Sequence, residues 1–302
     1  MAYVPPHKRL GRGESNSNNH QQQTLSNSVS SQQEQADLSI LFNAFTRICC
    51  INLDKRVDKW RRVQREAKKV GTLFHDKVER FSALEGRLLI EEERLDENDV
   101  CRLWDATSDA KYNRHVQPEM KILTPGEVGC ALSHIQLWRQ LAESNDETML
   151  ILEDDCTFAH SKGRSRFARV VSTALEQLPD DWALFYLGLS DRGERAYLDD
   201  VTNDNKTAND KMDPSVRLYR PYYGYQTHAY AIRKATAEIL LRDHLPIQGP
   251  IDVWLAENHW FDLPVYSAVI ANEGWKLDDG TYEGLDLVMQ QKRGVATDID
   301  RS

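Results

Sequence analysis

Three consecutive carboxylates, Glu153, Asp154 and Asp155, directly follow the apolar segment Met149–Leu152. An apolar run of this length predicts a buried strand, so the acids should lie at its carboxyl end, where α/β sheets bind their ligands. Like charges this close repel one another unless a cation offsets them, and carboxylate oxygens suit Mg²⁺ or Mn²⁺. A solvated acidic turn after a strand is the alternative interpretation.

The composition indicates a folded, acidic protein. Its 302 residues are 40% hydrophobic, which is enough for one large domain. The net charge of −9 argues against a general nucleic-acid binder, although a bound metal would still allow an anionic substrate. The five cysteines are an odd number and form neither the CxxC nor the Cys/His spacing of a zinc site.

Targeting segments are not evident in the sequence. The amino-terminal residues contain no apolar stretch of the secretory kind, and no later segment approaches the length of a membrane span. We therefore expect a cytoplasmic protein without a transmembrane segment.

Residues 1–37 are rich in Ser, Asn and Gln and lack periodic apolar positions. This composition is typical of a disordered tail, and the folded domain is then expected over residues 38–302. Within that domain, residues 199–214 are polar and rich in Asp and Asn, which predicts a mobile surface insertion.

Strand and helix patterns alternate along the folded part, which predicts an α/β fold with a mainly parallel sheet and helices on both faces. Thr124, Pro125 and Glu127 form a strong helix start, as N-cap, first helical residue and capping-box acid. Strands are expected at 45–53, 77–83, 149–153, 182–188, 230–232 and 265–270, and helices at 57–67, 91–104, 124–141, 168–178, 234–242 and onward from 251.

Six segments in a fixed order carry a family resemblance. They are Ile51–Asp54, Arg80–Ala83 with Gly86, Leu123–His134 (LTPGEVGCALSH), Ile151–Asp155, Gly224–Ile232 and Pro250–Asp252. Together they resemble the glycosyltransferases of family 25, which include bacterial lipooligosaccharide galactosyltransferases and collagen galactosyltransferase domains. The resemblance implies a GT-A type nucleotide-sugar-binding fold and transfer of a hexose with inversion at the anomeric carbon. UDP-galactose is the expected donor on this basis.

The same resemblance implies roles for individual residues. The outer acids Glu153 and Asp155 would bind Mn²⁺ or Mg²⁺ between the donor phosphates, where the ion acts as a Lewis acid on the leaving diphosphate. No phosphate role is assigned to Lys59, because the family often has Arg there and the two cations differ in donor geometry. The residues expected along the UDP-sugar are Asn52, Leu53, Asp54, Ala83, His134 and Asp154.

An inverting transfer also needs a base that removes the proton of the acceptor hydroxyl. Asp252, at a predicted helix start, is the first candidate and Glu127 the second. Each has a structural alternative, because the helix dipole favours an acid in a first turn and the capping box accounts for Glu127. His134 shares a helix face with Glu127 and has the alternative of a hydrogen-bonded core histidine.

Some sites have alternatives that the sequence leaves open. Asp54 could simply cap the helix that follows it, and a third metal ligand could come from His228 or Asp298. The acceptor is an unknown glycan, glycolipid or protein hydroxyl. Two other functions compete with transfer: a catalytically inactive nucleotide-sugar-binding protein, and a metal-dependent phosphohydrolase that uses the same acids.

Overall fold

The computed structural model describes residues 32–105, 120–161, 164–191, 195–198, 213–258, 263–271, 273–274 and 284–290. The predicted insertion at 199–214 lies outside these ranges except for its last two residues, and Asp298 lies outside them entirely. Among the described residues, no helix has the length and apolar composition needed to cross a bilayer.

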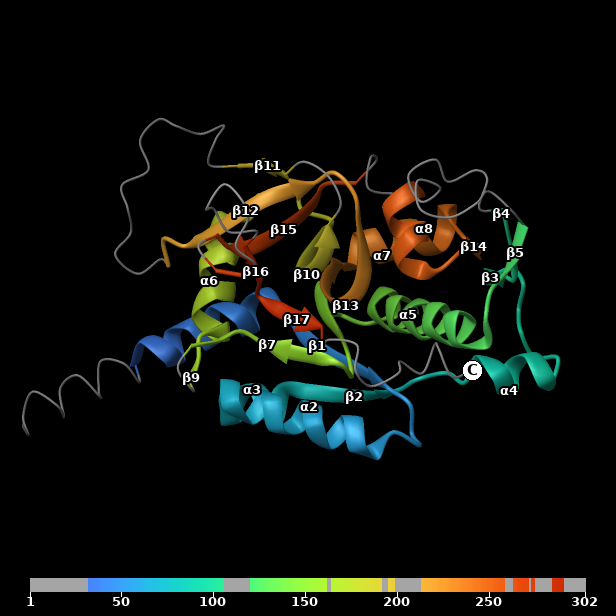
Figure 1. Ribbon diagram of the computed structural model, residues 1–302, viewed down its shortest axis with the longest axis horizontal. Coiled ribbons are helices and arrows are strands. Elements are labelled where there is room, and N and C mark those ends of the chain that lie inside the picture. Colours follow the sequence, from blue (N-terminus) through green and yellow to red (C-terminus); the bar gives the residue numbers. More distant parts are fainter. Residues whose placement is uncertain are drawn as a thin grey trace, which may run out of the picture.

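A mixed sheet, nine-stranded in the described chain, forms the centre of the molecule (Figure 1). Its strands are β1 (Arg47–Asn52), β2 (Val78–Ser82), β6 (Thr148–Glu153), β10 (Leu184–Asp191), β11 (Arg195–Tyr197), β12 (Val216–Pro221), β13 (Gly224–Arg233), β15 (Val265–Ile270) and β16 (Leu285–Asp286). They follow the order β11–β12–β15–β10–β13–β6–β1–β2, with β16 beside β15.

The strand directions divide this sheet into two parts. Strand β1 runs parallel to β2 and β6, and β10 runs parallel to β15. Strand β13 lies between the two parts and is antiparallel to both β6 and β10. The predicted α/β fold is confirmed, and its sheet is mixed because β13 at the centre and β11, β12 and β16 toward one edge form antiparallel pairs.

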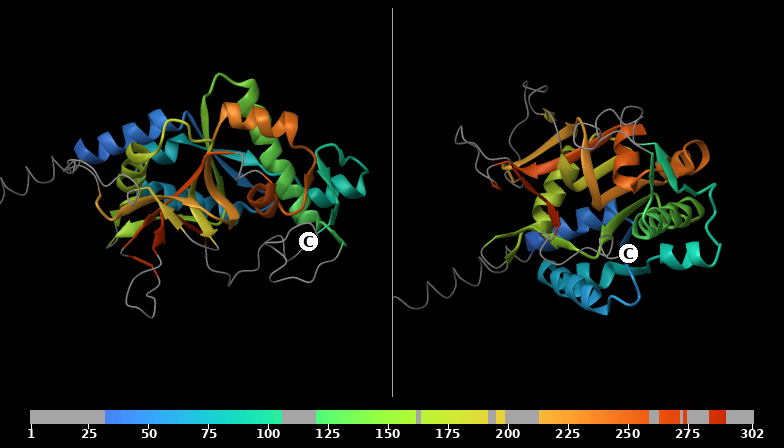
Figure 2. Two further views of the ribbon diagram at one scale, coloured as in Figure 1. Left: turned by 90° about the horizontal axis from the view of Figure 1, so that it is seen from above. Right: turned by 45° about the vertical axis from the view of Figure 1, so that its right-hand side comes forward.

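Helices cover both faces of the sheet, as predicted (Figure 2). One face packs against α5 (Pro125–Glu143), α7 (Lys234–Asp243) and α8 (Ile251–Asn258). The other packs against a helix over residues 32–44, α2 (Val57–Val70), α3 (Thr72–Lys77) and α6 (Phe167–Gln177).

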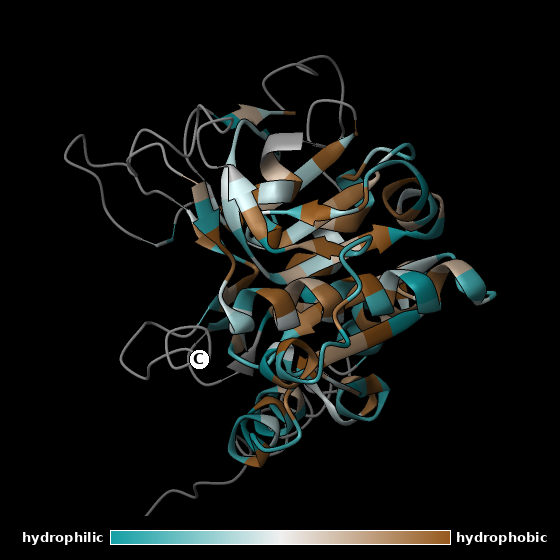
Figure 3. Ribbon diagram, turned by 90° about the vertical axis from the view of Figure 1, so that its right-hand side faces the viewer, coloured by the Kyte–Doolittle hydropathy of each residue, from teal (hydrophilic) through white to brown (hydrophobic). Residues whose placement is uncertain are grey.

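Strand alternation supplies both of these apolar layers. In β1, Cys49 and Ile51 face the α5 side, whereas Ile48 and Cys50 face the α2 side. Figure 3 shows hydrophobic segments gathered on the sheet and hydrophilic ones on the outer helices.

The domain begins earlier than residue 38. The helix over residues 32–44 includes six residues that were assigned to the tail. Asp37 is buried and accepts hydrogen bonds from Gln33 Nε2 (2.9 Å) and Ser172 Oγ (3.3 Å), while Leu38 and Leu41 belong to the core. The tail prediction is therefore wrong for residues 32–37, and residues 1–31 lie outside the described ranges.

The predicted helix over residues 91–104 is also wrong. Helix α4 (Gly86–Glu91) ends where that prediction began, and Glu93 follows it with a φ of 54°. Asp96 then accepts a hydrogen bond from the Asn98 backbone (2.9 Å), a turn that competes with helix formation.

Short strands take over beyond this turn. Strands β3 (Val100–Cys101) and β4 (Leu103–Asp105) pair with β14 (Ile247–Gln248) and β5 (Met120–Ile122). The remaining short strands are β7 (Cys156–Phe158), β8 (His160–Ser161), β9 (Arg164–Ser165) and β17 (Val288–Gln290).

Helix α5 begins as predicted and is fixed by a close backbone contact. Thr124 Oγ1 accepts the Glu127 N–H (3.2 Å), and Glu127 Oε2 accepts the Thr124 N–H (2.7 Å). A Cβ added to Gly86 would lie 2.0 Å from the Pro125 carbonyl oxygen, and one added to Gly129 would lie 2.5 Å from that of Leu84. These two glycines let the loop before α4 pack directly on the first turns of α5.

Candidate active site

The acidic residues lie at the carboxyl edge of two neighbouring parallel strands. Strands β1 and β6 pair with Ile51 opposite Glu153, so Asn52 and the three acids emerge at the same edge of the sheet. A turn at Asp154 and Asp155 then leads into β7. The predicted position of the acids, at the end of a buried strand, is confirmed.

A hollow of about 470 Å³ opens at this edge. All three acids line it, together with three cations, Lys55, Lys59 and Arg87. The rest of the lining is mainly small or apolar: Ile51, Asn52, Leu53, Ala83, Leu84, Glu85, Gly86, Pro125, Gly126, Gly129, Cys130, Ser133 and Gln290. The hollow therefore combines charged side chains with small and apolar residues from the loop before α4 and from helix α5.

The middle acid, Asp154, accepts hydrogen bonds from two other residues that line the hollow. Asn52 Nδ2 donates to its Oδ2 (2.7 Å), and Lys59 Nζ donates to its Oδ1 (2.9 Å). Burial raises the pKa of Asp154, although Lys59 and Asn52 act in the opposite direction. Asp154 is therefore hydrogen-bonded within the protein. Lys59, to which the sequence analysis assigns no phosphate role, provides the positive charge that pairs with Asp154.

The last acid, Asp155, has one oxygen without a partner among the described residues. Gln290 Nε2 donates to Oδ2 (3.0 Å), whereas Oδ1 is buried and accepts no hydrogen bond from the part of the chain that the structure describes. Burial, reinforced by the charges of Glu153 and Asp154, raises the pKa of Asp155 to about 7. An unpartnered buried oxygen beside two further carboxylates is an arrangement that a cation would stabilise.

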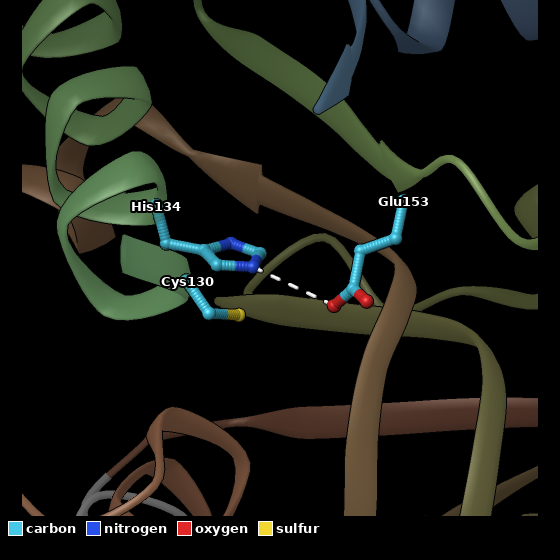
Figure 4. Close-up of side chains that lie close together, drawn as sticks. All are labelled: Cys130, His134 and Glu153. Carbon is cyan, nitrogen blue, oxygen red and sulfur yellow. Dashed lines mark ion pairs between the residues drawn. The ribbon is translucent and has the colours of Figure 1, made fainter. Parts of the chain in front are cut away.

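The first acid, Glu153, is held by neighbours on its side of the hollow. Thr227 Oγ1 donates to Glu153 Oε1 (2.7 Å), and His134 Nε2 lies 3.7 Å from the same oxygen (Figure 4). Burial acts to raise the pKa of Glu153, but His134 and Thr227 outweigh it and the pKa is lowered. This carboxylate is therefore kept ionised.

Two donor sets in this region could bind a metal. Glu153 and Asp155 offer oxygens to a hard cation, and the orphaned Oδ1 of Asp155 fits such a ligand. Cys130, His134 and Glu153 place a sulfur, a nitrogen and an oxygen within 4.8 Å of one another (Figure 4). That second set is softer and typical of zinc, and burial raises the pKa of the Cys130 thiol well above its ordinary value.

Arg62, which the sequence interpretation passed over, holds the acidic turn. Its guanidinium donates to the backbone carbonyls of Asp154 (3.4 Å), Asp155 (3.2 Å) and Cys156 (3.2 Å), and to Thr157 Oγ1 (2.7 Å). Because Lys59 and Arg62 are three residues apart on α2, they share one helix face. The sequence signal that could have identified Arg62 is this pair of basic residues, three positions apart on the helix after the first strand.

The residues predicted along the nucleotide separate into two groups. Asn52, Leu53 and Ala83 line the hollow, and the Ala83 N–H donates to the Asn52 carbonyl oxygen (3.0 Å). Asp54 is exposed outside the described lining and pairs with Arg80 (3.1 Å). It does not cap α2 either, since Arg56 is the N-cap.

The two predicted bases have structural partners and are not among the described residues lining the hollow. Asp252 Oδ2 accepts the Gln226 N–H and Oδ1 accepts the Val253 N–H, both at 2.9 Å. Gln226 has a left-handed φ of 78°, so Asp252 helps to hold a strained residue of β13. Burial raises the pKa of Asp252, and Glu127 completes the capping box of α5.

His228, one of the two candidate third ligands, lies beneath β17. The Nε2 atom donates to the Val288 carbonyl oxygen (3.0 Å), so Nε2 carries the proton. Nδ1 is buried and has no hydrogen-bond partner among the described residues. Burial lowers the pKa of His228. His228 is therefore neutral and is also outside the described lining of the hollow.

A mixed α/β sheet with acids at a central strand end is consistent with the GT-A type of glycosyltransferase fold. The chain belongs to glycosyltransferase family 25: residues 45–255 match the family described as "Glycosyltransferase family 25 (LPS biosynthesis protein)". This match confirms the resemblance inferred from the six segments.

Curated relatives include galactosyltransferases and one inactive protein. Procollagen galactosyltransferase 1-B of Xenopus laevis is 30% identical over 219 residues, or 70% of this chain and 31% of the relative. Procollagen galactosyltransferase 2 of Mus musculus is 27% identical over 215 residues, or 70% and 30%.

The inactive glycosyltransferase 25 family member 3 of Homo sapiens is 33% identical over 137 residues, or 45% of this chain and 20% of the relative. The chain thus spans about a third or less of the length of these relatives.

The raised pKa of Asp155 predicts a stability gain for Asp155→Asn in metal-free protein. The native carboxyl binds a proton up to about pH 7, whereas an ordinary Asp loses it near 3.8. Stability therefore falls as pH rises between these values and stays low above them. We expect Asp155→Asn in EDTA to raise the Tm at pH 8 and to raise it less at pH 5; a gain of about 1 kcal/mol corresponds to about 2–4 °C.

Thermal unfolding at the two pH values checks this expectation. Glu97→Gln, which neutralises an exposed acid, is the control and should change neither Tm. An Asp155→Asn protein no more stable than the parent at pH 8 would contradict the electrostatic account.

Arg62→Met should loosen the acidic turn while keeping an apolar stem in place. The loss of its four hydrogen bonds frees the turn that carries Asp155. Substitution of a residue that holds a metal ligand in place often weakens metal binding by about 10-fold or more. Mn²⁺ affinity can be measured from the electron paramagnetic resonance signal of free Mn²⁺. The exposed neighbour Arg61→Met is the matched control, and equal affinities in the two variants would refute the role of Arg62.

Proposed function

We propose that this protein is a metal-dependent inverting glycosyltransferase that moves a hexose from a UDP-sugar to a hydroxyl group. The observation that carries this proposal is the hollow itself, whose lining combines three acids at a strand end with Lys55, Lys59 and Arg87. Galactose is the proposed sugar because two of the relatives are named procollagen galactosyltransferases. The acceptor is a glycan, glycolipid or protein hydroxyl.

The charges of the hollow suit a nucleotide diphosphate. Lys55 is exposed and pairs with Glu85 (2.6 Å), and an exposed pair of this kind is weak enough to exchange for a phosphate. Glu153 and Asp155 would hold the divalent cation, which neutralises charge on the diphosphate when it is bound. The region of the hollow lined by Ala83 and Gly126 would accept the flat base and the ribose.

The transfer also requires removal of the acceptor proton, for which we propose Asp252. Each of its oxygens accepts one backbone hydrogen bond and keeps a second lone pair. Its raised pKa makes the carboxylate a stronger base than an exposed Asp. Asp154, bonded to Lys59 and Asn52, is not free for this step.

One relative supports a second candidate, a protein that binds a nucleotide sugar without transferring it. The human relative is named an inactive member of the family, and its similarity covers 45% of this chain. The two candidates share the donor site and differ only in turnover, so binding and turnover must be measured separately.

Donor binding predicts a metal-dependent thermal shift. UDP at about one hundred times its Kd, with Mn²⁺ present, should stabilise the protein by about 2.7 kcal/mol, a rise of about 5–10 °C in Tm. EDTA should abolish the shift, and so should Asp155→Ala, because its carboxylate is a proposed metal ligand. ADP serves as the control nucleotide. The absence of a shift with any uridine nucleotide would refute the proposal.

Turnover is tested by UDP release from UDP-galactose in the presence of Mn²⁺. Asp252→Asn should lower release by about 100-fold or more, the usual contribution of a general base, while the UDP shift persists. Asp58→Asn, which alters an exposed acid in the first turn of α2, should leave release unchanged. Binding without release by the parent protein would instead support the inactive candidate, and release of inorganic phosphate would indicate a hydrolase.

A further inference from the structure

Three fully buried aromatic side chains form a hydrogen-bonded chain behind the acids. Trp138 Nε1 donates to the Tyr230 hydroxyl oxygen (2.9 Å), and this hydroxyl lies 2.9 Å from His134 Nδ1. Both Trp138 and His134 come from α5, whereas Tyr230 comes from β13. The exposure of each side chain is 0%, so bulk solvent does not reach their polar atoms.

The donors in this chain determine which nitrogen of His134 carries the proton. An indole N–H can only donate, so the Tyr230 oxygen accepts from Trp138 and keeps its own hydrogen to donate. Among the described residues, His134 Nδ1 is the acceptor within reach of that hydrogen. Nδ1 must then be unprotonated, and the neutral ring carries its proton on Nε2.

The proton on Nε2 is directed at Glu153. Nε2 is buried and has no partner within hydrogen-bonding distance among the described residues, and Glu153 Oε1 lies 3.7 Å from it (Figure 4). This separation is beyond hydrogen-bonding distance, so the contact between the N–H and the carboxylate is electrostatic. Thr227 Oγ1 already donates to the same Oε1 at 2.7 Å.

We propose that His134 is a positioning residue, fixed by Tyr230 and Trp138 as an Nε2–H donor that orients Glu153. With His134 and Thr227 both on Oε1, the carboxylate plane is set and Oε2 remains for the cation. This role rests on the proposed function in that Glu153 is taken as a metal ligand. It differs from contact between His134 and the sugar, because His134 acts only through Glu153.

The same geometry argues against His134 as a ligand in the Cys130, His134 and Glu153 set. A metal bound at Nε2 requires the proton to move to Nδ1. The Nδ1–H would then donate to the Tyr230 oxygen, and the hydroxyl hydrogen of Tyr230 would lose its acceptor among the described residues. A buried donor without an acceptor is unfavourable, so the hydrogen-bonded chain favours the donor role.

The tautomer can be observed directly in the full chain, without metal or nucleotide. Long-range ¹H–¹⁵N correlation spectra of ¹⁵N-histidine-labelled protein distinguish protonated from unprotonated ring nitrogens, and the His134→Gln spectrum assigns the signals. We expect His134 to have an unprotonated Nδ1 and a protonated Nε2. Tyr230→Phe should alter this pattern, whereas Tyr219→Phe, a fully buried tyrosine on β12, should leave it unchanged. A protonated Nδ1 in the parent protein would overturn the proposal.

A second measurement tests the effect on Glu153. We expect Tyr230→Phe and His134→Phe to weaken Mn²⁺ binding by about 10-fold, and His134→Gln, which keeps an N–H donor, to recover part of that loss. Equal Mn²⁺ affinity in Tyr230→Phe and Tyr219→Phe would overturn the positioning role.

Binding of Zn²⁺ or Co²⁺ tests the opposing role, in which His134 is itself a metal ligand. A thiolate-to-Co²⁺ charge-transfer band that disappears in both Cys130→Ser and His134→Gln would identify His134 as a ligand and overturn the proposal. If the parent protein binds neither Mn²⁺ nor UDP, the proposed function fails, whereas the metal-free tautomer still reports on His134 independently.

Discussion

The structure depends on keeping three adjacent carboxylates at the end of a buried strand. Such a cluster is unfavourable because each charge is desolvated and repelled by its neighbours. The three acids differ in how their charges are compensated. Asp154 is paired with Lys59, and Glu153 accepts a hydrogen bond from Thr227 and lies 3.7 Å from His134 Nε2. Asp155 keeps one oxygen without a hydrogen-bond partner among the described residues. Asp155 is therefore the acid of the three whose charge is least compensated by the described residues.

Helices α2 and α5 hold the three acids in place from the two sides of the sheet. Helix α2 supplies Lys59 below the acids and Arg62 behind their backbone, so one helix face fixes both the side chain and the turn. Helix α5 approaches from the other side of the sheet and is held against the loop before α4 by Gly86 and Gly129. The acids therefore lie between α2 and α5, and support from both sides is the condition for a preorganised ion site.

Local patterns in the sequence predicted most of the fold and the position of the site. The apolar run of β6, the capping box of α5 and the 3.6-residue periodicity of α2 each depend on near neighbours, and all three are confirmed. The helix expected at 91–104 was wrong because side-chain turns such as that of Asp96 outweighed an acidic, helix-compatible composition. The partners of the acids were missed because Thr227 and Gln290 reach them only through tertiary structure.

Strand β17 shows how far a folded unit can extend beyond the region of recognisable similarity. The family match ends at residue 255, yet β17 pairs with β7 directly after the acids and brings Gln290 to Asp155. Gly188 has no room for a side chain because the Val288 carbonyl would lie 2.1 Å from its Cβ. A chain cut at the edge of the match would keep every recognised motif and lose one wall of the site. The folded structure that completes the site therefore extends beyond the region of sequence similarity.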